Sequence, residues 1–355
     1  MTVASAGSGS GGEVRAHAPG RVNLIGDHTD HAGGLALPMA IDLGTTVTGR
    51  RGGTTVRLTS SAEAGTAHVP LTGGDPRRAE PPWARYVAGV VSEVAPRIGF
   101  DGRVDTSLPV GAGLSSSASL ELAVALALGF DGPALDLARL GRRAEQRASG
   151  VPCGLMDQLT SACGVAGHAL LVDFTAESFT PVPVPEHADV VVVHSGVARA
   201  LAGSPYAERQ AQCRAAADVI GPLAEASTAD VAAVPDPVVR RRARHVVTEN
   251  DRVRAMAAAL AAGDLTTAGR AMLESHASLR DDFEVSVPAL DRAVEALMAV
   301  PGVVGARLTG AGFGGCVVAL AERDALADPA SLTGRGWRVR ASDGARVEGW
   351  APPGR

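Results

Sequence analysis

The sequence predicts a protein of two domains built from mixed helices and strands, and three observations lead to this conclusion. Its 355 residues exceed the size of about 250–300 residues at which one hydrophobic core usually stops growing. Segments with the two-residue periodicity of strands alternate with longer helical segments. Prolines occupy every second position of 181–185, which is typical of a connector. We therefore expect a disordered tail over residues 1–12, an N-terminal domain over 13–180 and a C-terminal domain over 181–355.

The basic residues of this chain are all arginines: there are 33, and lysine is absent. Without a lysine amine, P-loop ATPases, protein kinases of the usual type and pyridoxal-phosphate enzymes are excluded. The mild formal charge of −5, without a basic patch, argues against nucleic acid as a partner. No apolar run approaches the length of about 20 residues that crosses a membrane. The four cysteines contain no Cys-x-x-Cys pair, which indicates reduced thiols, and we expect a cytoplasmic protein.

The N-terminal domain begins with a strand-like segment, 14–18, that leads into a polar loop. Residues 18–34 combine an arginine, two carboxylates and two histidines between glycines, and 35–41 return to apolar character. This density of polar residues is typical of a loop that contacts a polar ligand. Asp27, His28 and Asp30 can accept from and donate to several hydroxyls, as a sugar requires. A metal pair of His28 and His31 is disfavoured, because the glycines oppose a helix that would align the two rings.

Strands are expected over 47–71 and 102–108, with a helix beginning near Trp83 between them. The two aromatic residues at the start of this helix, Trp83 and Tyr86, are equally consistent with a nucleotide-base pocket and with core packing.

A glycine- and serine-rich segment, 108–122, follows. Gly111 and Gly113 permit tight turns, and the residues after the serine run are typical of a helix. Such a loop presents unpaired backbone N–H groups and the positive end of a helix dipole, an arrangement that binds phosphate. Its spacing matches neither the P-loop nor the Rossmann fingerprint. Taken alone, the segment is better explained as a turn that precedes a helix.

Two acidic residues follow on expected helices. The helix over 135–148 is rich in arginine, and its Glu145 is either an ion-pair partner, which the bare sequence favours, or a metal ligand. Asp157 lies near the start of a further helix, so it is either a helix cap, again favoured, or a carboxylate that acts as a base in a cleft. Residues 168–174 are expected to form a strand.

The C-terminal domain is expected to hold a buried strand over 190–194 and helices over 206–220, 238–262, 264–280 and 290–300. The arginine-rich run 240–245 is interpreted as a solvent-exposed helix face, because acidic residues follow at once. A strand over 303–308 leads into four glycines within 310–315. Such a turn allows another backbone or a ligand to approach closely.

Three motifs, taken in order, resemble the GHMP small-molecule kinases and, within them, the galactokinase branch. They are Pro-Gly-Arg-Val-Asn-Leu-Ile-Gly-Asp-His-Thr-Asp at 19–30, Leu-Pro-Val-Gly-Ala-Gly-Leu-Ser-Ser-Ser-Ala-Ser at 108–119, and Leu-Thr-Gly-Ala-Gly-Phe-Gly-Gly at 308–315. Residues 153–158 and 206–213 are similar to the same branch. The resemblance implies an α+β protein with the two-domain GHMP kinase architecture and an active site in the cleft between the domains.

The resemblance also implies a role for each candidate residue. Asp157 becomes the catalytic carboxylate and Arg21 its charged partner. Mg²⁺ is bound by Ser117 and Glu145, in place of the ion pair favoured above. The ATP phosphates are wrapped by Gly111, Ala112, Gly113, Leu114, Ser115, Ser116 and Ser117. The sugar is contacted by Asp27, His28, Thr29, Asp30, Gly154 and Tyr206, and the glycine turn closes the site.

The implied reaction is the ATP-dependent phosphorylation of the anomeric hydroxyl of galactose to galactose 1-phosphate. It needs in-line placement and charge neutralisation, which Arg21 and Mg²⁺ would supply, while Asp157 accepts the proton. Asp27, His31 and Ala32 stand where galactokinases usually have Glu, Tyr and Asn, so a related hexose, an amino sugar or a cyclitol is an alternative substrate. A regulatory relative that binds sugar and ATP is disfavoured, because the candidate catalytic groups are all present. We expect a monomer.

Overall fold

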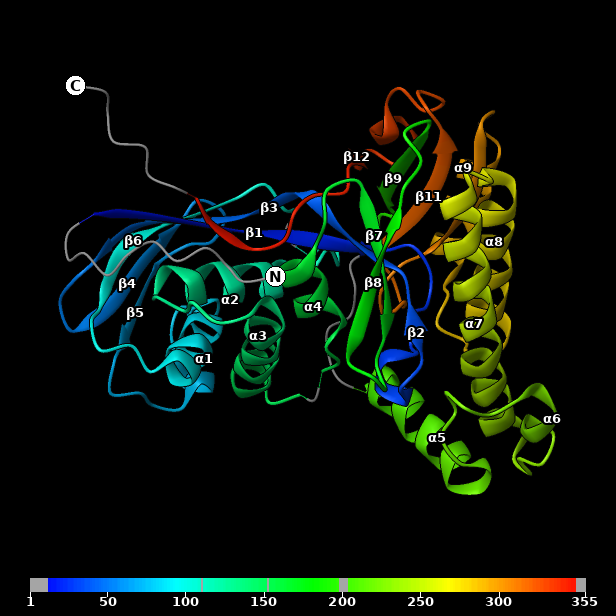
Figure 1. Cartoon of the computed structure of the whole chain (residues 1–355), viewed down its shortest axis with the longest axis horizontal. Helices are drawn as coiled ribbons and strands as arrows, with labels where there is room; N and C mark the ends of the chain where they lie inside the picture. Colours follow the sequence, from blue (N-terminus) through cyan, green and yellow to red (C-terminus); the bar gives the residue numbers. More distant parts are fainter. Residues whose placement is uncertain (1–11, 110, 152, 198–203, 349–355) are drawn as a thin grey trace.

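The computed structural model describes residues 12–109, 111–151, 153–197 and 204–348. The expected disordered tail lies outside these ranges except for Gly12. A six-stranded sheet fills the left half of Figure 1, with the strand order β13-β1-β3-β6-β4-β5. Its strands are β1 (Glu13–Asn23), β3 (Pro38–Arg51), β4 (Thr55–Ser60), β5 (Thr66–Pro70), β6 (Phe100–Thr106) and β13 (Arg346–Glu348).

Four helices lie on one side of this sheet (Figure 1). They are α1 (Ala84–Val94), α2 (Ser116–Ala127), α3 (Ala134–Ser149) and α4 (Met156–Cys163). Helix α2 packs against β1 and β3 on one side and against the other three helices on the rest of its surface. A helix surrounded in this way needs no polar face, which explains why residues 122–127 are all apolar and buried. The first turn of α2 is thereby fixed beneath the sheet.

The other half contains two smaller sheets. The three-stranded sheet has the order β2-β7-β8, formed by β2 (Leu35–Ala36), β7 (His168–Asp173) and β8 (Ser178–Pro183). The four-stranded sheet has the order β10-β11-β9-β12, formed by β10 (Val303–Leu308), β11 (Cys316–Glu322), β9 (Ala188–His194) and β12 (Gly336–Val339). Residues 190–193 of β9 are four consecutive buried valines, as expected for a strand covered on both faces.

The helices of this half are α5 (Ser204–Ile220), α6 (Thr228–Val231), α7 (Pro237–Ala262), α8 (Leu265–Asp281) and α9 (Pro288–Met298). Helices α8 and α9 pack against the four-stranded sheet, α7 packs against α8 and the three-stranded sheet, and α5 and α6 pack against α7. Helices α7 and α8 lie side by side at the right of Figure 1. Three 3-10 turns complete the described elements: η1 (Asp30–Ala32), η2 (Pro76–Arg78) and η3 (Pro329–Leu332).

The expected mixture of helices and sheets in two parts is confirmed. Two strands bear on the expected division of the chain. Pro181 lies inside β8, and β13 returns from the C-terminal end to pair with β1 in the first sheet. The division at residues 180 and 181 stays a prediction.

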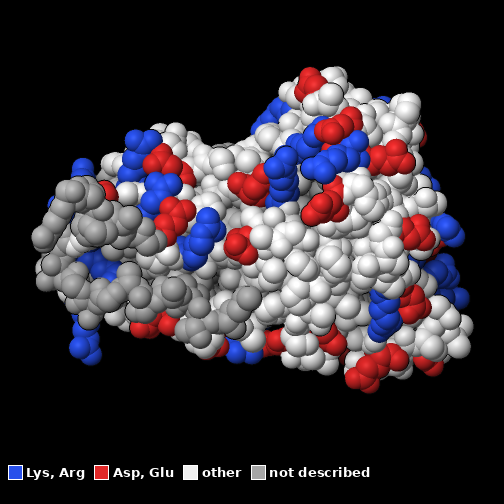
Figure 2. Space-filling model, turned by 45° about the horizontal axis from the view of Figure 1, so that its top comes forward, with Lys and Arg blue, Asp and Glu red and all other residues white. Residues whose placement is uncertain are grey.

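One expectation about the surface is wrong in part. The run 240–245 is expected to face solvent, and 49% of the Arg244 side chain is exposed, yet Arg242 is 1% and His245 0% exposed. Both are buried because α7 lies between α5, α8 and the polar loop, and partners from those elements bind the two side chains. Elsewhere arginines lie next to acidic residues, as on the face shown in Figure 2. None of the helices in the described ranges combines the length and the apolar character needed to span a bilayer.

Candidate active site

A cleft of about 990 Å³ is lined by residues from both halves of the molecule. Three segments meet there: the polar loop (residues 24–34), the phosphate loop (residues 111–117) and the glycine turn (residues 309–315). Their lining residues include Asp27, His28, Asp30, Gly111, Gly113, Ser115, Ser116, Ser117, Gly310 and Ala311. The cleft therefore brings together the three motifs that the sequence places far apart.

Asp157 lies on the first turn of α4 and is held by two neighbours. Arg21, on β1, is 3% exposed and places its Nε at 2.8 Å and a terminal nitrogen at 2.7 Å from Asp157 Oδ1. The Ser115 hydroxyl donates to Asp157 Oδ2 at 2.6 Å. The Asp157 side chain remains 30% exposed and lines the cleft. Its orientation is thus fixed from two sides while it stays accessible to a ligand.

The phosphate loop reaches its shape through left-handed backbone conformations. The φ angles of Gly111, Gly113 and Ser115 are 74°, 76° and 60°, a region that glycine enters at little cost. Arg21 binds this loop as well: its backbone N–H donates to Leu114 O at 3.2 Å, and Nη1 donates to Gly113 O at 2.7 Å. Helix α2 begins next, at Ser116. Its first N–H groups have no helical acceptor, so an anion in the cleft can bind them.

Ser117 and Glu145 are neighbours at the cleft, where the serine hydroxyl donates to Glu145 Oε1 at 3.0 Å. Behind them, Gln158 Nε2 donates to Glu145 Oε2 at 2.5 Å and to Glu121 Oε2 at 3.2 Å. Burial, followed by the negative charge of Asp157, raises the pKa of Glu145, and burial raises that of Glu121 well above its usual value. A cation beside Ser117 and Glu145 would relieve this accumulation of carboxyl groups.

The donors fit Mg²⁺ in kind, since Mg²⁺ binds hydroxyl and carboxylate oxygens. Among the described residues, no group of three or more His, Cys, Asp or Glu side chains is placed to hold a metal ion.

The polar loop is held in place by buried side chains of α7. His245 Nε2 donates to Asp27 O at 3.1 Å, Glu249 Oε1 accepts from Gly26 N at 3.0 Å, and Asn250 Oδ1 accepts from Leu35 N at 2.8 Å. Sequence reasoning missed these three residues, because single polar residues in a helical pattern give no sign of being buried. They fix the main chain on both sides of the polar loop.

Asp27 forms a buried ion pair within the protein. Its Oδ2 lies 2.7 Å from a terminal nitrogen of Arg307, and the two side chains are 2% and 0% exposed. Its Oδ1 accepts from Gly310 N at 3.1 Å. The carboxylate expected to contact a sugar thus also joins the polar loop to β10 and the glycine turn. Arg307 gave no signal in the sequence.

Asp30 lies against Gly154 at the edge of the cleft. A Cβ atom on Gly154 would lie 1.7 Å from Asp30 Oδ2, so no residue other than glycine fits while Asp30 keeps its place. Burial, followed by the negative charge of Asp157, raises the pKa of Asp30 to about 6. The two residues, predicted together as sugar contacts, are therefore neighbours.

Of the other residues expected to contact the sugar, Thr29 lies inside the loop, whereas His28 and Tyr206 line the cleft. Thr29 is fully buried, with its hydroxyl 2.9 Å from Gly26 O and 2.7 Å from Leu35 O, so it shapes the loop from inside. His28 has a φ angle of 65° and lines the cleft with Tyr206; their rings are 5.6 Å apart.

Trp83 and Tyr86 also line the cleft, together with apolar residues such as Leu120. Trp83 is only 7% exposed and also packs in the hydrophobic core, so both possibilities for these aromatic residues stay open.

Comparison with known protein families shows which family the segments that line the cleft belong to. The galactokinase galactose-binding signature matches residues 8–51, the N-terminal domain of GHMP kinases matches 85–165, and the GHMP kinase C-terminal domain matches 256–332. The galactokinase of Homo sapiens is 43% identical over 94% of this chain and 92% of its own length. The chain belongs to the galactokinase family. The galactokinase of Chloroflexus aurantiacus is also 43% identical, over 87% of this chain and 84% of its own length.

Solved structures agree with this family assignment. The Lactococcus lactis galactokinase, solved with galactose, superposes with a TM-score of 0.87 and 33% identity over 94% of both chains. The mevalonate kinase of Methanococcus jannaschii has a TM-score of 0.66 at 20% identity, over 95% of this chain and all of its own length. This more distant similarity shows the shared GHMP kinase fold alone, and the expected fold is confirmed.

Proposed function

We propose that this member of the galactokinase family transfers the γ-phosphoryl group of ATP to the anomeric hydroxyl of galactose, with Asp157 as base and Arg21 as charge stabiliser. Family membership supports the reaction. One observation carries the residue assignment: Asp157 is held by Arg21 and Ser115 in a cleft shared by the phosphate loop and the polar loop.

In the proposed step, the C1 hydroxyl of the sugar gives its proton to Asp157 as its oxygen bonds to the γ-phosphorus. The bond between this phosphorus and the β–γ bridging oxygen breaks, and ADP leaves. Arg21 contacts Asp157 and the phosphate loop at once, so its positive charge lies between the base and the loop that would hold the phosphates. Because the chain has no lysine, the positive charge beside the phosphates comes from a guanidinium, and backbone N–H groups add neutral hydrogen-bond donors.

The ATP would extend from the phosphate loop toward Trp83 and Tyr86, which line the same cleft and can stack on its base. The residues that would hold Mg²⁺ are Ser117 and Glu145. The ion supplies charge neutralisation on the phosphates when it is bound. Glu145→Gln should therefore raise the Mg²⁺ concentration needed for half-maximal activity. Asp136→Asn, an exposed change on the same helix, should leave it unchanged.

The sugar would contact Asp30, His28 and Tyr206, which border the cleft on its polar-loop side. Asp27 lies beneath them with its carboxylate engaged by Arg307 and by Gly310 N. Each Asp27 carboxylate oxygen that could contact the substrate therefore already has a protein partner. We expect Asp27 to contribute mainly by fixing the polar loop.

The experiment is ADP release from MgATP with galactose, glucose, galactosamine, N-acetylgalactosamine and a cyclitol, with the product identified by phosphorus NMR. Turnover with galactose and a signal for galactose 1-phosphate is the expected outcome. Turnover with another sugar alone would keep the mechanism and change the substrate. Binding of galactose and ATP without ADP release would indicate a regulatory protein and contradict the proposal.

A further inference from the structure

Residues 282–285 form the first part of the loop between α8 and α9 and lie next to the polar loop. Phe283 is 0% exposed, and its ring lies 4.6 Å from the His28 ring and 4.8 Å from that of His245. Val285 O accepts from Phe313 N of the glycine turn at 2.8 Å. The loop therefore supports both the residue that lines the sugar side of the cleft and the turn that borders it.

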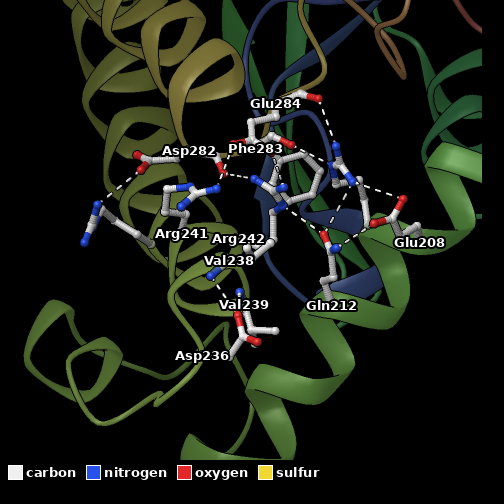
Figure 3. A network of polar contacts seen from close by, with 12 residues as sticks. Glu208, Gln212, Asp236, Val238, Val239, Arg241, Arg242, Asp282, Phe283 and Glu284 are labelled. Carbon is white, nitrogen blue, oxygen red and sulfur yellow. Dashed lines mark hydrogen bonds and ion pairs between the residues drawn. The ribbon is translucent and has the colours of Figure 1, made fainter.

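Two buried arginines bind three consecutive carbonyl groups of this loop (Figure 3). Arg209 Nε donates to Phe283 O at 2.7 Å, and its Nη2 donates to Glu284 O at 3.1 Å. Arg242 donates from Nη1 to Asp282 O. The side chains of Arg209 and Arg242 are 10% and 2% exposed. A guanidinium has a rigid fork of donors, so it fixes a main chain more firmly than an ammonium group can.

The loop needs this support because its backbone is strained. Glu284 has a φ angle of 55°, a left-handed conformation that residues other than glycine rarely adopt. Its carboxylate accepts from Arg242 at 2.5 Å and from Arg241 at 2.7 Å. A strained backbone conformation persists where the surrounding contacts hold it in place. At Glu284 the contacts with the arginines hold it.

Arg209 also connects the loop to a second sugar-side residue. It lies on α5 three positions after Tyr206, so the two side chains leave the same side of the helix one turn apart. Tyr206 places its ring 5.6 Å from His28. Anchoring Arg209 on the loop therefore fixes the helix that carries Tyr206, and Gln212 of the same helix accepts from Arg242 Nε at 2.9 Å (Figure 3).

We propose that Arg209 and Arg242 are positioning residues for sugar recognition: they hold loop 282–285 and helix α5 so that His28 and Tyr206 face each other across the sugar side of the cleft. Neither arginine lines the cleft. The inference rests on the proposed function, and it predicts an effect confined to the sugar. The phosphate loop, Arg21 and Asp157 belong to the other side of the site and have no contact with this network among the described residues.

The test compares Arg209→Ala, Arg209→Lys and a matched control, Arg244→Ala. Arg244 reaches the same loop, but only the Asp282 carboxylate, at 3.2 Å and with 49% of its side chain exposed. We expect Arg209→Ala to raise the KM for galactose about tenfold or more, since displacements of about 1 Å in an active site have effects of this size or larger. The KM for ATP should stay within about twofold. Arg209→Lys should rescue little, and Arg244→Ala should match the wild type.

A second variant keeps the test decisive if Arg209→Ala does not fold. Arg242→Lys keeps the positive charge but replaces the rigid fork that donates to Gln212 Oε1, Asp282 O and the Glu284 carboxylate, so it should show the same selective rise in the KM for galactose. Unchanged galactose KM in both variants, or equal rises in the KM values for galactose and ATP, would overturn the inference. A wild-type protein that is inactive with galactose would instead overturn the proposed function.

Discussion

The buried ion pair between Asp27 and Arg307 provides a quantitative test of the structure. Asp27→Asn removes the negative charge and leaves the Arg307 guanidinium, 0% exposed, with one remaining hydrogen bond within the described part of the chain, to Asn23 O at 3.4 Å. Removing one partner of a buried pair costs about 3–5 kcal/mol, because the other charge is left uncompensated. The asparagine oxygen can still accept from Gly310 N, so we expect about 3 kcal/mol. That is a large part of a typical unfolding free energy of about 5–15 kcal/mol.

The assay is urea unfolding followed by circular dichroism, which gives the free energy of unfolding for each variant. Asp101→Asn is the matched control, since its ion pair with Arg57 is exposed at 67% and 49% and surface pairs contribute little. Arg307→Met added to Asp27→Asn removes the stranded charge and should recover much of the loss. A cost below about 1 kcal/mol for Asp27→Asn would refute the reasoning, because the pair would then contribute no more than a surface pair.

Two further predictions concern the sugar side of the cleft. Gly154→Ala would put a Cβ atom 1.7 Å from Asp30 Oδ2, so kcat/KM for galactose should fall about 100-fold. In the control variant Gly74→Ala no atom lies within 4 Å of the new Cβ atom, so kcat/KM should not change. Steady-state kinetics compare the two variants. The pKa of Asp30 is raised from 3.8 to about 6 in the folded state, so its contribution to the unfolding free energy is lost as the pH rises from about 4 to about 6. Asp30→Asn should remove this decline from stability curves measured across that range, and an unchanged decline would refute the assignment.

The segments that the sequence located correctly are those whose chemistry lies in consecutive residues. The phosphate loop and the glycine turn are marked by glycines, and their positive φ angles at Gly111, Gly113, Gly310 and Gly312 show why those residues are needed. The polar loop is marked by its density of charged and hydroxyl groups. These local signals marked the three segments, and the resemblance to the GHMP kinases assigned them to one cleft.

The contacts that hold those segments could not be predicted in the same way. The burial of His245 and Glu249 depends on how α7 packs against the polar loop, and a polar residue in a helical pattern has the same local sequence whether it is buried or exposed. For the same reason the run containing Arg242 was placed at the surface. The ion pair that the bare sequence favours for Glu145 does not form among the described residues, because its arginine-rich helix turns this residue toward Ser117 and Gln158. Long-range partners of this kind require the fold.

The role of Asp157 as the base can be tested by single-turnover phosphoryl transfer in the Asp157→Asn variant, with saturating galactose and MgATP. Asparagine keeps the size of the side chain but cannot take a proton from the sugar hydroxyl. We expect a rate lower by about 100- to 10,000-fold, with galactose and ATP affinities within a few-fold of the wild type. Ser115→Ala, which removes one hydrogen bond to Asp157 and leaves the base, should cost far less. A transfer rate near that of the wild type in Asp157→Asn would contradict the assignment of Asp157 as the base.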